Sequence, residues 1–149
     1  MISKKIYLVL LFTITLIING CGYTSIYSSK SNSFKINNIK NKDNKINKKI
    51  VKSLKSISND NSPNEIDLII SSSKEKRILS KNKSGKAEIF ELRINLNVTY
   101  LNRVKTLNMK QNYSNVDNKF QLKEYEKIIE KQLIDELIDS LINYLTNFK

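Results

Sequence analysis

The stretch FELRINLNVTY, Phe90–Tyr100, decides the fold, because apolar and polar residues alternate through it without interruption. Successive side chains of a β-strand point to opposite faces of the sheet, so the pattern predicts a strand with one buried face and one wet face. The predicted strand runs over residues 89–101, which is about 43 Å at roughly 3.3 Å per residue and longer than a usual strand. Its buried face holds Phe90, Leu92, Ile94, Leu96, Val98 and Tyr100.

Three weaker alternations predict further strands around the long one. One covers residues 66–78. Gly85 follows it and favours a hairpin, because glycine readily adopts positive φ. Residues 101–105 then turn the chain into a strand at 107–113, and the first strand of the chain is expected over 33–39.

Two segments show the helical period instead. Ile46, Ile50, Leu54 and Ile57 predict a helix of about four turns, and Asp43 or Asn44 could cap it. The second predicted helix covers residues 122–147, and its apolar stripe faces the core or, as an alternative, a partner or a membrane surface. That stripe consists of Ile128, Ile129, Leu133, Ile134, Leu137, Ile138, Leu141, Ile142, Leu145 and Phe148.

These elements predict an α+β fold in the order β-α-β-β-β-α. Each apolar surface needs another to cover it, so we expect a two-layer sandwich of a four-stranded, mainly antiparallel sheet with both amphipathic helices on one face. A single domain over residues 33–149 follows, because the chain is too short for two cores.

The N-terminus has the layout of an export signal. Lys4 and Lys5 precede an apolar run of about 13 residues, roughly 20 Å as a helix, whereas a bilayer core is about 30 Å thick. The run ends at Asn19-Gly20-Cys21, which looks like a lipobox and holds the only cysteine. We therefore expect a lipoprotein signal peptide at 1–20, a lipidated Cys21 and a tether at 21–32. An ordinary signal peptide or a short membrane anchor is the alternative.

Composition narrows the class of function. The formal net charge of +12 falls to +10 without the predicted signal peptide, which holds two lysines and no acid. The excess favours anionic partners, and export argues against nucleic acid, although codon bias toward lysine contributes. The chain contains no histidine, and the lone cysteine is assigned to lipid. Glu124, Glu126 and Glu130 are expected on the solvated side of their helix, so the sequence predicts no enzyme, no cofactor and no metal site.

The mature start, Cys21-Gly22-Tyr23-Thr24-Ser25-Ile26-Tyr27, resembles that of the LPS-assembly lipoproteins, the LptE family. Family members often begin Cys-Gly-Phe or Tyr-x-Pro-Leu-Tyr, so Ser25 replaces the proline and Ile26 the leucine. The element order, the mature length, the hairpin glycine and the long strand are similar as well. The resemblance implies an outer-membrane lipoprotein on the periplasmic side, which plugs the LptD β-barrel and assists insertion of lipopolysaccharide into the outer leaflet.

The resemblance also implies a site for lipopolysaccharide. A basic hairpin would attract the phosphates and sugar carboxylates of that lipid. The candidates are Lys74, Lys76, Arg77, Lys81, Lys83 and Lys86. Two alternatives stay open: the hairpin is only a solvated, lysine-rich surface, and the chain is a structural or pilot lipoprotein of another envelope machine, such as a secretin or a phospholipid transport system.

Overall fold

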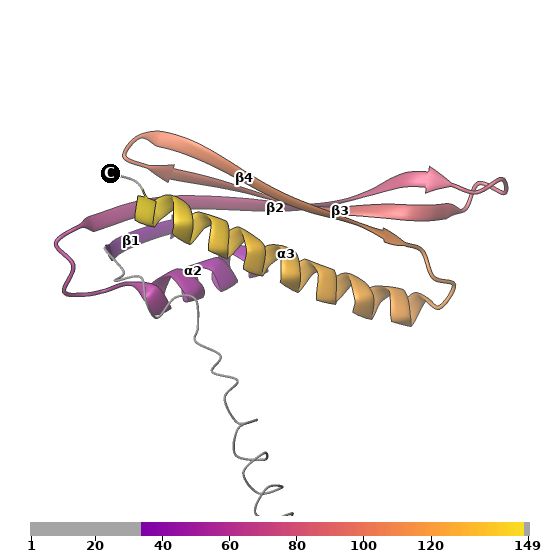
Figure 1. Cartoon of the computed structure of the whole chain (residues 1–149), viewed down its shortest axis with the longest axis horizontal. Coiled ribbons are helices and arrows are strands. Elements are labelled where there is room, and N and C mark those ends of the chain that lie inside the picture. The colour runs from indigo at the N-terminus through magenta and orange to yellow at the C-terminus, as the bar shows by residue number, and fades with distance from the viewer. Residues whose placement is uncertain (1–33, 148–149) are drawn as a thin grey trace, which may run out of the picture. The chain divides into compact units, whose positions relative to one another are not determined.

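A computed structural model describes residues 34–147 of the chain and confirms the predicted α+β architecture (Figure 1). The element order is strand, helix, three strands and helix, as predicted. The elements are β1 Lys35–Asn41, α2 Lys45–Ile57, β2 Glu65–Lys81, β3 Ala87–Tyr100, β4 Arg103–Ser114 and α3 Lys119–Asn147. The predicted signal peptide at 1–20, Cys21 and the tether at 21–32 lie outside the described residues.

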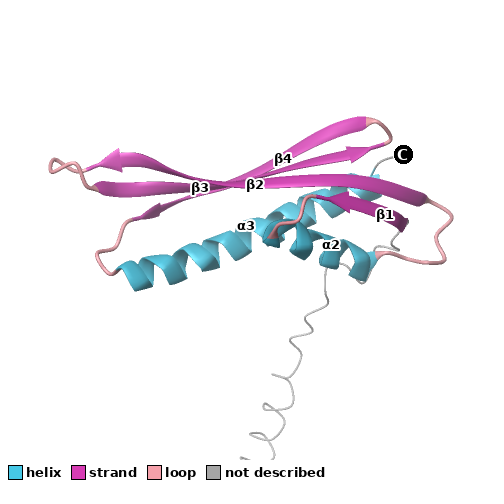
Figure 2. Cartoon of the chain, turned by 180° about the vertical axis from the view of Figure 1, so that it is seen from behind, coloured by secondary structure: helices cyan, strands magenta, loops and turns pink. Residues whose placement is uncertain are grey.

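The four strands form one sheet in the order β1-β2-β3-β4. β1 pairs with β2 in parallel, whereas β2 with β3 and β3 with β4 are antiparallel. Parallel neighbours require a crossover connection, and α2 provides it between β1 and β2. Both helices lie on the same side of the sheet in Figures 1 and 2, which leaves its other face open.

The last two strands are joined by a tighter turn than the sequence predicts. β4 begins at Arg103, so the turn expected over residues 101–105 reduces to Leu101 and Asn102. Both residues have positive φ, 48° and 61°, which is typical of a two-residue type I′ hairpin. Leucine has no preference for that conformation, and this is why no local signal marked the turn.

The core lies between the helices and the inner face of the sheet, on the residues that the two periodicities predict. The strands contribute Ile66, Leu68, Ile70, Phe90, Leu92, Ile94, Leu96, Val98 and Tyr113. The helices contribute Ile46, Ile50, Leu54, Ile129, Leu133, Ile134, Leu137, Ile138, Leu141, Ile142 and Leu145. Of the predicted buried face of β3, only Tyr100 is half-buried.

One residue of the predicted α3 stripe does not reach the core, and another cannot be placed. Ile128 is 62% exposed, whereas its neighbour Ile129 is 1% exposed. Successive residues are separated by about 100° around a helix, and that step turns Ile128 away from the sheet. Phe148 lies outside the described residues.

The N-cap of α2 fixes how much of β2 this helix covers. The Asn44 side chain accepts a hydrogen bond from the Asn47 backbone at 2.7 Å, as expected of an N-cap. Its Nδ2 also donates to the Ser72 backbone carbonyl at 3.3 Å. α2 therefore begins level with Ser72, and the second half of β2 continues past the N-terminus of the helix. α3 packs against β3 and β4.

Within residues 34–147, no helix combines the length and apolarity needed to span a bilayer.

Candidate functional site

The β2–β3 hairpin projects past the end of α3 (Figure 1) and carries the predicted basic residues. Asn82 organises its turn, because the Asn82 Oδ1 accepts hydrogen bonds from the backbone N–H groups of Ser84 and Lys86 at 3.1 and 2.9 Å. Gly85 has φ +80° there, a conformation that glycine adopts without steric cost. The glycine turn predicted for this hairpin is therefore confirmed.

Three of the predicted lysines surround this turn. Lys81, Lys83 and Lys86 are all exposed, and none of their ammonium groups forms an ion pair within residues 34–147. Neighbouring cations repel one another, and a bound anion would relieve that repulsion. The tip is therefore the part of the hairpin that is electrostatically prepared for an anionic ligand.

Lys74 and Lys76 lie on the inner face of β2 and reach across to α3. The Lys74 ammonium forms an ion pair with Glu130 at 2.9 Å, and the Lys76 ammonium forms one with Glu126. Two residues of a strand advance about 7 Å and four residues of a helix advance about 6 Å, so the spacing of the lysines matches that of the glutamates. These two lysines hold the projecting half of β2 to the N-terminal half of α3.

Glu126 has a second donor in this network. The Tyr113 hydroxyl donates to the Glu126 carboxylate at 2.8 Å. Burial alone would raise the pKa of Glu126, but the hydrogen bonds from Lys76 and Tyr113, together with the lysine charges, lower it. Burial, followed by the bond to this carboxylate, raises the pKa of Tyr113. At neutral pH, Glu126 is therefore charged and Tyr113 is its neutral donor.

Arg77 lies on the opposite, open face of the sheet, where its Nε donates to Glu75 at 2.8 Å. That hydrogen bond lowers the pKa of Glu75. In the next strand Glu91, expected on the wet face, is only 6% exposed. Arg93 and Lys110 contact its carboxylate at 2.9 and 3.9 Å, and their long side chains cover it without a second layer of protein.

The six predicted basic residues therefore do not form one cluster: three lie at the tip, two face α3, and Arg77 lies on the open face. The expectation that all three glutamates of α3 are solvated is wrong for Glu126 and Glu130, which face β2. It holds for Glu124, whose side chain is 46% exposed and pairs with Lys127. The matching spacings of lysines and glutamates were the available signal for these contacts.

Sequence reasoning also missed three exposed apolar residues directly behind the tip. Ile78 is 52% exposed, Leu79 49% and Ile89 39%. They lie in β2 and β3 next to the turn that carries Lys83 and Lys86. Ile78 pairs with Phe90 on the helix side, whereas Ile89 pairs with Ser114 on the open side. Exposed apolar side chains thus follow the basic tip on both faces of the hairpin, which suits a ligand with both charged and apolar parts.

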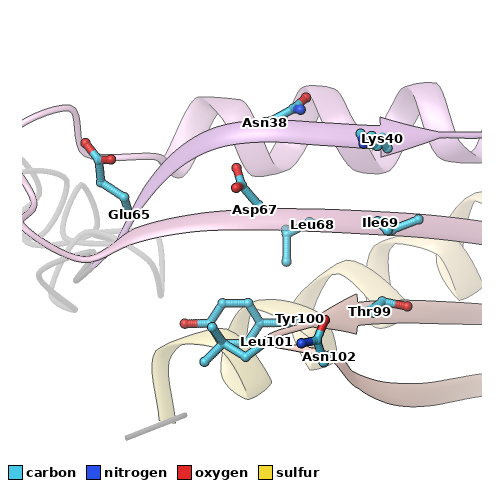
Figure 3. A pocket seen from close by; sticks show the side chains of 10 residues that line it. All are labelled: Asn38, Lys40, Glu65, Asp67, Leu68, Ile69, Thr99, Tyr100, Leu101 and Asn102. Carbon is cyan, nitrogen blue, oxygen red and sulfur yellow. The ribbon is translucent and has the colours of Figure 1, made fainter.

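A shallow groove of about 400 Å³ lies at the other end of the sheet (Figure 3). It is lined by Asn38, Lys40, Glu65, Asp67, Leu68, Ile69, Thr99, Tyr100, Leu101 and Asn102. Figure 3 shows that these side chains come from β1, β2, the end of β3 and the turn after it. Ile69 and Leu101 are more than half exposed there, at 52% and 66%.

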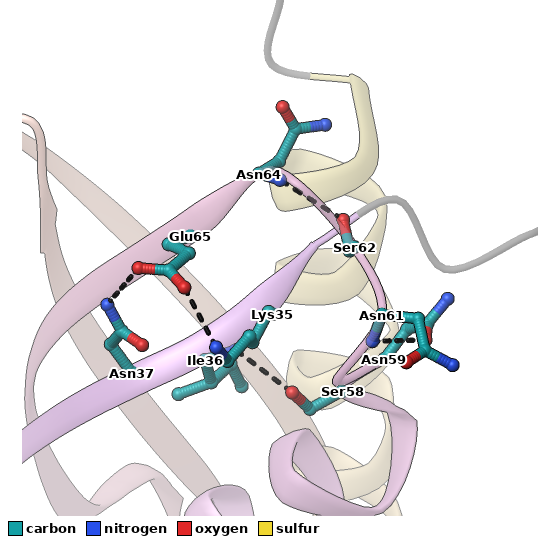
Figure 4. Close-up of polar contacts among 9 residues, drawn as sticks. All are labelled: Lys35, Ile36, Asn37, Ser58, Asn59, Asn61, Ser62, Asn64 and Glu65. Atoms are coloured by element: carbon teal, nitrogen blue, oxygen red, sulfur yellow. Dashed lines mark hydrogen bonds and ion pairs between the residues drawn. The ribbon is translucent and has the colours of Figure 1, made fainter.

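The Glu65 carboxylate, at the rim of this groove, stabilises the pairing of β1 with β2. Figure 4 shows Glu65 between Lys35 and Asn37, which donate to its two oxygens at 2.8 and 2.7 Å. The hydrogen bond from Lys35, followed by that from Asn37, lowers the pKa of Glu65. Ser58 accepts from the Ile36 backbone at 2.9 Å, and this contact fixes the end of α2 to β1. Among residues 34–147, no group of three or more His, Cys, Asp or Glu side chains could hold a metal ion.

Comparison with known proteins gives one match in sequence and several in fold. The model of the lipopolysaccharide-assembly family LptE matches residues 31–145, most of the chain. No curated protein matches the chain in sequence. The match begins three residues before the described part of the chain and includes the hairpin, the sheet and nearly all of α3.

Two solved structures are similar in fold. The rare lipoprotein B of Shewanella oneidensis superposes with a TM-score of 0.57 at 13% identity, over 73% of this chain and 93% of that one. An uncharacterized lipoprotein B of Nitrosomonas europaea gives a TM-score of 0.59 at 16% identity, over 77% and 86% of the two chains. At these identities the likeness concerns the fold alone.

Proposed function

This chain belongs to the LptE lipopolysaccharide-assembly family, and from that membership we propose that it plugs an LptD-like β-barrel and binds lipopolysaccharide for insertion into the outer leaflet. The observation that carries the proposal is the group of exposed lysines at the β2–β3 tip, Lys81, Lys83 and Lys86, which form no ion pair with any residue of 34–147. A role in assembly also supports the prediction that the chain is not an enzyme.

Lipopolysaccharide binding combines two features of the hairpin. The phosphates of lipid A attract the tip lysines, and the exposed Ile78, Leu79 and Ile89 offer apolar contact to the acyl chains. The other three predicted basic residues lie away from the tip. Lys74, Lys76 and Arg77 already have carboxylate partners, so we assign them to positioning the hairpin rather than to first contact with the ligand.

A barrel partner is supported by the open face of the sheet. Its central rows consist of short, uncharged polar residues, which suit the polar lumen of a large barrel. They are Ser71, Asn97 and Thr106 in one row and Ser73, Asn95 and Asn108 in the next. Within the first row, the Thr106 hydroxyl donates to Asn97 at 2.8 Å.

The membrane anchor remains part of the proposal. Cys21 would carry the lipid that holds the domain at the outer membrane, on its periplasmic side, and the several acyl chains of a bacterial lipoprotein give stable attachment. A Cys21→Ser variant is expected to lose labelling by radioactive palmitate and to leave the membrane fraction. Retention of the label would show that the lipid is attached elsewhere.

Charge reversal at the tip tests ligand binding. A Lys81→Glu/Lys83→Glu variant is expected to bind purified lipopolysaccharide at least about tenfold more weakly at low salt, because two attractive charges become repulsive. The matched control is Lys52→Glu/Lys131→Glu, which changes the net charge equally at exposed positions away from the hairpin. Equal binding by both variants would contradict a site at the tip.

Purification from membranes tests the barrel partnership. A C-terminally tagged chain, extracted in mild detergent, is expected to bring down an LptD-like barrel in a one-to-one ratio. A secretin or a phospholipid transporter in place of the barrel would instead support the alternative of a pilot lipoprotein.

A further inference from the structure

We propose that the free edge of β4 binds an extended, acidic peptide segment of another protein, which joins the sheet as an additional strand. β4 is the last strand in the sheet order, and no strand of residues 34–147 pairs with its outer side. An unpaired edge presents a row of backbone donors and acceptors that another strand can use. The inference does not depend on lipopolysaccharide binding or on a barrel partner.

The backbone groups that would bind this strand follow from the register. The Asn115 N–H donates to the Glu88 carbonyl at 2.7 Å, one step beyond the Ile89–Ser114 pair. In an antiparallel ladder, pairs that exchange hydrogen bonds alternate with pairs that do not. Odd-numbered residues of β4 therefore bond to β3, and even-numbered ones direct their peptide groups outward. These are Val104, Thr106, Asn108, Lys110, Asn112 and Ser114.

β4 lacks three of the features that usually protect an edge. Natural sheets use short edge strands, bulges and proline to prevent pairing, and they also use lysines, which β4 does carry and which favour an acidic partner over a neutral one. β4 has 12 residues in continuous register with β3, and it contains no proline. The opposite edge differs: β1 has 7 residues, and its register shifts between Ile36 and Asn38. The two edges are thus unequal, and β4 is the one suited to pairing.

The charge of β4 selects the kind of partner. The strand carries Arg103, Lys105 and Lys110 and no acidic residue. A second copy of this chain is a poor occupant, because its β4 edge carries the same three cations and no acidic residue to meet them. An extended segment with acidic side chains is attracted instead.

The two faces of β4 define the side-chain pattern of that segment. On the helix side, Leu107 and Met109 are half-buried at the margin of the core. On the open side, Thr106, Asn108 and Lys110 are exposed and polar or charged. Arg103 and Lys105 also lie on the helix side, because they pair with Tyr100 and Val98. The best occupant therefore has apolar residues beside Leu107 and Met109 and acidic residues beside Lys105 and Lys110.

Hydrogen exchange can detect the added strand directly. The probe is a capped peptide of about nine residues, with glutamates placed to meet Lys105 and Lys110 and valines placed to meet Leu107 and Met109. It is added to the full-length chain in detergent micelles. We expect exchange of the outward-facing β4 amides to slow at least about tenfold, because the bound strand occupies them. The same peptide with lysine in place of glutamate is expected to bind at least about tenfold more weakly, since its attractive contacts with Lys105 and Lys110 become repulsive.

Two substitutions separate edge pairing from other binding. Asn108→Pro removes one outward N–H while keeping the bonds to β3 and is expected to abolish the protection, whereas Asn108→Thr, which keeps the N–H, retains it. Lys105→Glu leaves the backbone intact. It is expected to weaken binding of the acidic peptide and to strengthen binding of the lysine peptide. Unchanged exchange with the acidic peptide, equal binding of both peptides, or full protection in a folded Asn108→Pro variant would each overturn the proposal.

Discussion

The ammonium nitrogen of Lys76 lies 4.0 Å from the centre of the Phe90 ring. The same nitrogen is paired with Glu126, and Phe90 packs against Tyr113 with their centroids 5.5 Å apart. A cation over an aromatic face is attracted to it, most strongly where water is partly excluded. The projecting half of the hairpin is thus joined to α3 by one charged, partly buried junction that also involves the aromatic core.

Removal of this cation is expected to lower stability modestly. Lys76→Met keeps the apolar contact with Phe90 but leaves Glu126 without its ammonium partner, and we expect a loss of about 1 kcal/mol in the free energy of unfolding. Urea denaturation measures the loss. Lys81→Met is the matched comparison, because Lys81 lies at the tip and forms no ion pair within the described part of the chain. A Lys81 variant that is equally destabilised would argue against a special role for Lys76.

The lowered pKa of Glu126 predicts the direction of a pH effect. As the pH falls, the unfolded chain binds the proton first, near the ordinary value of 4.5, and the folded chain binds it only at lower pH. The stability from this group is complete above 4.5 and is lost as the pH falls through the folded pKa. Glu126→Gln should therefore flatten the fall in unfolding free energy between about pH 6 and about pH 3.

Other carboxylates will keep part of that slope, because the pKa values of Glu65 and Glu75 are lowered as well. Glu88→Gln, at an exposed position of β3, provides the comparison. If Glu88→Gln flattened the curve as much as Glu126→Gln, the ion pair would not be its source.

The hairpin turn should tolerate a larger side chain at Gly85 but not a residue that disfavours positive φ. An added Cβ at Gly85 would meet no atom within 4 Å, so only the positive φ opposes substitution. Gly85→Ala is expected to cost about 1 kcal/mol, and Gly85→Asn less, because asparagine enters the left-handed region more readily. Thermal unfolding of the two variants checks the order. Equal losses would mean that the turn changes conformation.

Two positions of α3 should respond very differently to the same change. Leu137 is 0% exposed and Ile128 is 62% exposed. Leu137→Ala is expected to cost about 3 kcal/mol, because it leaves a cavity in the core, whereas Ile128→Ala should cost less than about 0.5 kcal/mol. Chemical denaturation provides both values. A large loss at Ile128 would place that residue in a packed interface.

The local pattern of apolar and polar residues predicted the helices, the strands and the core. Backbone geometry alone sets the period at which side chains return to one face of a helix or a strand. Alternation in β3 and the helical stripe of α3 each specify one apolar face, and two such faces bury each other. Boundaries were less predictable. β2 extends beyond Ile78 to Lys81, since exposed polar residues can continue a strand that is paired on one side. The turn at Leu101 depends on the pairing of its flanking strands rather than on its own residues.

The sequence by itself determined the order of the elements, the buried face of each and the basic character of the hairpin, because these depend on residues close together along the chain. Only the tertiary structure decided which charges are paired. Lys74 and Glu130 are 56 residues apart, and Lys76 and Glu126 are 50 apart. An ion pair depends on distance in space, and the packing of α3 against the sheet brings these groups together, whereas no carboxylate of residues 34–147 reaches the lysines at the tip.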